Sequence, residues 1–87
     1  MTVDEYRKKV EGRIRKAATR NEAKSILDEA SETLIEANIA RVYVRQFWVA
    51  LYTDLNFVIK EQRDTATHDI VAYALQVIAE LSAEASK

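Results

Sequence analysis

The stretch IARVYVRQFWVALYTDLNFVIKEQRDTATH, residues 39–68, decides how the rest of this chain is organised. It contains the only Trp, both Phe, two of the four Tyr and the only His of the 87 residues. From Ile39 to Ile59 its apolar residues recur at steps of three and four, which predicts one long helix. Strand-forming residues around Val42 also allow a β-hairpin with its tip at 53–56. We favour the helix because the periodicity is long and an isolated hairpin is poorly stable.

This central helix has more than one apolar face. A second stripe, formed by Val44, Trp48 and Tyr52, runs beside the first. A helix of this kind lies either in the middle of a bundle or at a dimer interface. We therefore predict that an aromatic stripe serves core or dimer packing, or binds a partner protein through an exposed Trp48–Tyr52 patch. The candidate interface residues are Tyr43, Phe47, Trp48 and Tyr52.

The composition favours helices throughout. The chain has one Gly and no Pro, whereas sandwiches and barrels need many turn residues. We predict an all-α fold, a small antiparallel bundle of three or four helices with a long aromatic-rich central helix, in one domain spanning residues 1–87. A chain of this length buries a modest share of its surface, so we also expect a homodimer.

Several classes of protein are excluded or disfavoured. The chain has no Cys, so disulfides, thiolate metal sites and thiol nucleophiles are ruled out. No apolar run reaches the length of a membrane span, and the first residues lack the apolar core of a secretion signal. We expect a cytoplasmic protein that does not enter a membrane.

Short polar motifs punctuate the flanking helices. Residues 2–5 (TVDE) and 19–22 (TRNE) fit capping boxes, so helices are predicted to begin there. The last helix is predicted to begin near Thr65 or Thr67. Asn38 leaves open whether residues 22–62 form one bent helix or two. Gly12, inside the first helix, suggests a close contact with another helix.

Charge is unevenly distributed between the first two predicted helices. Residues 1–20 carry a net charge of +4 and residues 21–40 a net charge of −4, although the whole chain has −1. The simplest interpretation is two solvated faces that attract each other within a bundle or across a dimer. The alternative is an anionic partner such as RNA on the basic helix.

Arg63, Asp64 and His68 form the first candidate for chemistry. Cleavage of RNA without a metal needs a group that moves a proton and a cation beside the phosphate. His68 can supply the first near neutral pH, and Arg63 the second. A turn between two helices can bring these two side chains together. The other interpretation is a polar group at a helix cap.

The sequence Arg63-Asp64-Thr65-Ala66-Thr67-His68 resembles the R-x4–6-H motif of HEPN domains, which are small, often dimeric helical bundles. The resemblance extends over roughly residues 20–80, with an acidic helix leading into an aromatic-rich one. It implies metal-independent RNA cleavage or nucleotide binding in a toxin or defence system, with Arg63 and His68 catalytic and Asp64 orienting them. The polar residues between Arg63 and His68 depart from the family's more apolar pattern.

Paired carboxylates are the second candidate. Glu29-x-x-Glu32 followed by Glu61-x-x-Asp64 is similar to the E-x-x-E…E-x-x-D pattern of all-α NTP pyrophosphohydrolases. Such pairs facing each other across helices can hold Mg²⁺ on a pyrophosphate. The alternative is a solvated acidic face, in which case no cofactor is expected.

Two function classes follow. The first is a HEPN-like ribonuclease or nucleotide-binding module. The second is a non-enzymatic helical interaction protein, such as an antitoxin, immunity protein or inhibitor, acting through a dimeric aromatic and charged surface. A Mg²⁺-dependent pyrophosphohydrolase is a further alternative.

Overall fold

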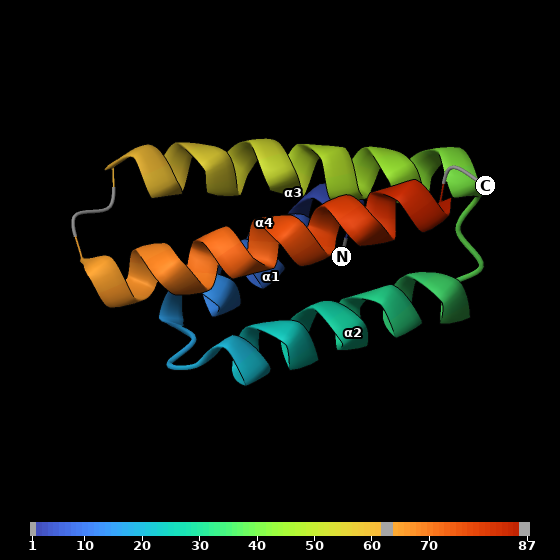
Figure 1. Ribbon diagram of the computed structural model, residues 1–87. Coiled ribbons are helices and arrows are strands. Elements are labelled where there is room, and N and C mark those ends of the chain that lie inside the picture. The colour runs from blue at the N-terminus through green and yellow to red at the C-terminus, as the bar shows by residue number, and fades with distance from the viewer. Residues whose placement is uncertain (1, 62–63, 86–87) are drawn as a thin grey trace.

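The computed structural model describes residues 2–61 and 64–85, and these form four α-helices. The helices are α1 (Val3–Lys16), α2 (Arg20–Glu36), α3 (Arg41–Glu61) and α4 (Thr65–Ala85). Consecutive helices run in opposite directions, as Figure 1 shows. The predicted all-α antiparallel bundle with a long aromatic-rich helix is therefore confirmed. The β-hairpin alternative for the central segment is wrong, because that segment is α3.

The four helices surround one apolar core, but they pack against one another to different extents. The most extensive packing is between α3 and α4, and α4 also packs along α2. Helix α1 lies against the other three, behind α4 in Figure 1. The α2 and α3 helices are successive in the chain but lie on opposite sides of the bundle. The bundle thus has an α1–α2 side and an α3–α4 side.

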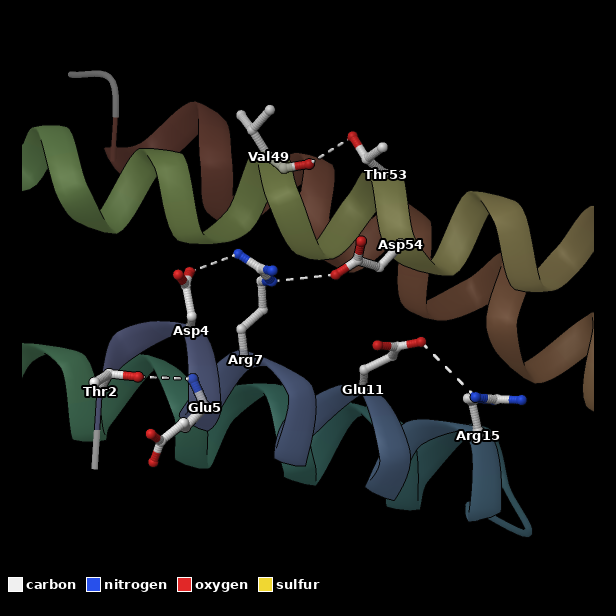
Figure 2. Close-up of polar contacts among 9 residues, drawn as sticks. All are labelled: Thr2, Asp4, Glu5, Arg7, Glu11, Arg15, Val49, Thr53 and Asp54. Atoms are coloured by element: carbon white, nitrogen blue, oxygen red, sulfur yellow. Dashed lines mark hydrogen bonds and ion pairs between the residues drawn. The ribbon is translucent and has the colours of Figure 1, made fainter.

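The helix starts are capped as the sequence predicts. Thr2 Oγ1 accepts a hydrogen bond from the Glu5 N–H at 3.1 Å (Figure 2), and Thr19 Oγ1 accepts one from the Glu22 N–H, also at 3.1 Å. The Glu22 carboxylate in turn accepts a hydrogen bond from the Ala18 N–H at 3.0 Å. The two threonine bonds satisfy backbone donors that the first turn of a helix leaves without partners.

Residues 22–62 do not form one continuous helix, because α2 ends at Glu36 and a turn separates it from α3. Asn38 adopts a left-handed conformation with φ of 57°. The Asn38 N–H bonds to the Ile35 carbonyl at 3.0 Å, and the Ile39 N–H to the Leu34 carbonyl at 3.4 Å. This pair of bonds is the Schellman motif. Asn tolerates the left-handed conformation better than most residues, which explains how the turn forms without glycine.

Ion pairs link α1 to its neighbours. The Arg7 guanidinium donates to Asp54 of α3 at 3.1 Å and to Asp4 of its own helix at 2.9 Å (Figure 2). Arg13 pairs with Glu29 of α2 at 3.1 Å. The attraction expected between the basic and the acidic helix is therefore present within the chain.

The prediction of a close helix contact at Gly12 is wrong. A Cβ placed on Gly12 would have nothing within 4 Å outside its own helix. The glycine therefore costs helix stability without a packing benefit that the structure shows. We expect Gly12→Ala to raise the free energy of unfolding by about 0.5–1 kcal/mol, measured as a higher urea midpoint.

The matched control for this change is Gly12→Val. It fills the same open space with a β-branched side chain that has lower helix propensity, so the gain should be smaller than for alanine. A lower midpoint for Gly12→Ala would show that the position is crowded after all.

Candidate functional site

The polar start of α4 holds two of the three residues predicted to be catalytic. Arg63 lies outside the described residues. The Asp64 carboxylate accepts hydrogen bonds from the Ala66 N–H at 3.2 Å and from Thr67 Oγ1 at 2.9 Å. These bonds make Asp64 the N-cap of α4. The Asp64 carbonyl also accepts from the His68 N–H at 2.9 Å, and the His68 side chain is exposed.

Next to His68, an ion pair ties the start of α4 to the start of α2. The Arg20 guanidinium donates to both oxygens of Asp69, at 2.6 and 2.9 Å. This hydrogen bonding lowers the pKa of the Asp69 carboxyl and raises the pKa of Arg20. Arg20 also lies 5.6 Å from the centre of the Tyr73 ring. The arrangement is bidentate and solvent-exposed, and it links the start of α4 to the start of α2.

The four carboxylates of the pyrophosphohydrolase pattern are not brought together. Glu29 is paired with Arg13 on the α1 side of the bundle. Within residues 2–61 and 64–85, no three His, Cys, Asp or Glu side chains lie close enough to hold a metal ion. Glu32, Glu61 and Asp64 are all exposed. The described part of the chain therefore places these carboxylates on solvated helix surfaces.

The four aromatic interface candidates separate into two groups. Phe47 and Trp48 are 2% and 1% exposed and belong to the core, with their rings edge to face at 5.0 Å. Tyr43 and Tyr52 are exposed. The predicted Trp48–Tyr52 surface patch is therefore wrong for Trp48, whose indole faces the other helices. Phe47 also stacks against Tyr6 of α1 at 5.9 Å.

A different surface stands out on the α3–α4 side of the bundle. From α3 it presents Val42, Val49 and Tyr52, which are 56%, 50% and 41% exposed. From α4 it presents Ala72, Ala79 and Ala83, which are exposed and recur at helical spacing. Between the helices runs a groove of about 260 Å³, with Val49 and Tyr52 on one wall and Ala79 and Ser82 on the other. We call these six residues and their groove the α3–α4 face.

This face is poor in charge, in contrast to the opposite side. Of the 31 residues in α1 and α2, 16 are charged, whereas only 8 of the 42 in α3 and α4 are. Several of those eight point to other helices: Asp54 and Asp69 bind arginines of α1 and α2, and Glu84 lines a groove shared with α2. A sparsely charged, apolar surface on a small helical bundle is typical of an interaction site.

The α4 half of this face was missed by the sequence reasoning. The signal was present, because residues 65–85 contain three acidic residues and no Lys or Arg. The solvated face of a helix ordinarily carries charged and polar residues, so the outer side of this helix is not an ordinary solvated face. The sequence was used to predict where this helix begins, and its exposed alanines were assigned no role.

No described helix is both long and apolar enough to cross a membrane. Comparison of the chain with protein families, with curated proteins and with solved structures gave no match. The surface must therefore be judged on its own chemistry.

Proposed function

We propose that this protein is a non-enzymatic helical interaction protein, and that it works as a homodimer whose contact surface is the α3–α4 face. The observation that carries the proposal is the exposure of Val42, Val49 and Tyr52 beside three exposed alanines, on the side of the bundle with the least charge. Apolar anchors at the centre of a patch supply most of the free energy of association. Antitoxins, immunity proteins and inhibitors are the classes that act in this way.

The contacts made by the carboxylates at the start of α4 support the same proposal. The Asp64 carboxylate is engaged in capping the helix, and Asp69 is engaged by Arg20. These two carboxylates thus have roles that stabilise the helix start and its contact with α2. The α3–α4 face has no such role within one copy of the chain.

Val49→Glu is expected to convert the dimer into a monomer, because the carboxylate would be desolvated in an apolar contact. The measurement is the mass in solution by light scattering, across chain concentrations from micromolar to near-millimolar. Val49 is half exposed in the single chain, so helix content and melting temperature should change little.

Phe57→Glu is the matched control. Phe57 is 62% exposed and lies on the same helix, but it borders α1 and lines a groove with Lys8 and Arg15. This variant should remain dimeric. A monomeric wild-type chain over the whole concentration range, or a Val49→Glu chain with dimer mass, would overturn the proposal.

A second function, metal-independent RNA cleavage, has one observation in its favour. The His68 side chain is exposed one helical turn after Asp64, where it could exchange a proton with a bound phosphodiester. The test is cleavage of RNA in EDTA by the wild-type chain, Arg63→Ala and His68→Ala. Cleavage lost in both folded variants would replace our proposal with this one.

The interaction function predicts no cleavage by any of the three chains. Thr67→Ala serves as the control, because it removes a hydroxyl that bonds to Asp64 and leaves His68 in place. Hydrolysis of nucleotides that appears only with added Mg²⁺ would instead support the carboxylate alternative.

A further inference from the structure

The two halves of the α3–α4 face differ in relief. The α3 half carries large side chains, Val42, Val49 and Tyr52, whereas the α4 half carries the methyl groups of Ala72, Ala79 and Ala83, with the amide side chain of Gln76 between the first two. Close packing requires that large residues of one surface meet small residues of the other. A second copy of this chain offers small side chains opposite the large ones if its α4 lies on α3 of the first copy.

We infer that two copies pack with their two-fold axis parallel to the helices, so that α3 of each copy lies on α4 of the other. This inference rests on the proposed function, which requires a dimer at this face but not this arrangement. In an isologous interface each contact occurs twice, once in each direction. Val49 of each copy would then enter the space between Ala79 and Ala83 of the other.

The positions of the groove residues along the bundle axis fit this arrangement. Val49, Tyr52, Ala79 and Ser82 line one groove, so they lie at the same height. A two-fold axis parallel to the helices keeps every residue at its own height and exchanges only the two halves of the face. Val49 and Tyr52 therefore meet the α4 residues that are level with them.

Charge distinguishes this arrangement from the alternative. If the two-fold axis were perpendicular to the helices, α3 of one copy would lie antiparallel on α3 of the other. Arg45 of one copy would then approach Lys60 of the other. With the axis along them, Arg45 meets the last turns of α4, near Glu80, where unpaired carbonyls carry partial negative charge. The first pairing is repulsive and the second is attractive, so electrostatics selects the parallel axis.

The available area suits a dimer of ordinary size. Helices α3 and α4 have 21 residues each. Side by side they present a rectangle of about 30 × 20 Å. A standard interface takes about 800 Å² of accessible surface from each partner, which side chains projecting from such a rectangle supply.

The absence of native cysteine allows a direct test by disulfide trapping. Chains carrying Val49→Cys are mixed in equal amounts with chains carrying Ala79→Cys and oxidised. The arrangement predicts that the mixed disulfide dominates, because a disulfide forms only between Cβ atoms about 3.5–4.5 Å apart. Ser25→Cys, exposed on α2, measures the background from random collision.

The outcomes separate the two claims. A dimer by light scattering in which Val49→Cys chains cross-link with themselves as fast as with Ala79→Cys chains would overturn the arrangement and leave the proposed function standing. A wild-type mass by light scattering that rises above that of a dimer with chain concentration would overturn it in favour of head-to-tail contacts. A wild-type chain that is monomeric throughout would overturn both.

Discussion

Trp48→Ala is expected to lower the free energy of unfolding by about 3–5 kcal/mol, the range for removing a large aromatic side chain from a core. The indole is 1% exposed and packs edge to face on Phe47. A domain of this length has about 4–13 kcal/mol of total stability, so the variant should lose a large share of it and melt at a much lower temperature. Circular dichroism followed through a thermal and a urea transition measures the loss.

Two further variants make this prediction specific. Trp48→Phe keeps an aromatic ring at the position and should lose less than the alanine variant. Phe57→Ala removes a similar apolar ring from a position that is 62% exposed on the same helix, and it should change stability by less than about 0.5 kcal/mol. If Trp48→Ala and Phe57→Ala had similar melting curves, the placement of Trp48 in the core would be wrong.

The position of Trp48 shows where reading of the sequence reaches its limit. Periodicity correctly identified α3 as a helix with two apolar stripes, one including Phe47, Leu51 and Leu55 and the other including Trp48. The buried side of α3 lies between those stripes and takes members from both. Spacing alone cannot find this direction, because it depends on where α1 and α4 pack against α3. Val42 and Tyr43 follow the same spacing as the core residues and yet are exposed.

Local signals were more informative than long-range ones. Thr2 and Thr19 were predicted as caps and are caps, because capping depends on bonds within four residues. Asn38 gave an ambiguous signal, because a left-handed residue that is not glycine is uncommon. That α2 and α3 lie apart, although they are successive in the chain, follows only from packing of the whole bundle.

The candidate site illustrates the same division. Asp64 and His68 were singled out for their spacing, and the structure shows a capping role for Asp64 that any helix start can use. The α3–α4 face is formed by side chains of two helices that lie side by side only in the folded bundle. Its alanines carry no motif, so they become informative only when Val49 and Tyr52 are seen beside them.

Ile14→Ala is expected to lower the free energy of unfolding by about 2–5 kcal/mol. Val10 and Ile14 are the buried residues of α1, which otherwise carries nine charged residues among its 14. The ion pairs of Arg7 and Arg13 are part-exposed or exposed, and such pairs contribute only about 0–1 kcal/mol each. The apolar contacts therefore hold α1 on the bundle.

A helix of 14 residues is marginally stable in water by itself, so loss of its anchor should also loosen the helix. Hydrogen exchange of the α1 amides should then rise more than exchange of the α3 amides, in addition to a lower urea midpoint. Ile35→Ala is the matched control, since Ile35 is 72% exposed and the same atoms are removed. It should change the midpoint little, because few apolar contacts are lost at an exposed position. Equal effects of the two substitutions would mean that α1 is held by its charges, and its attachment would then weaken steeply with added salt.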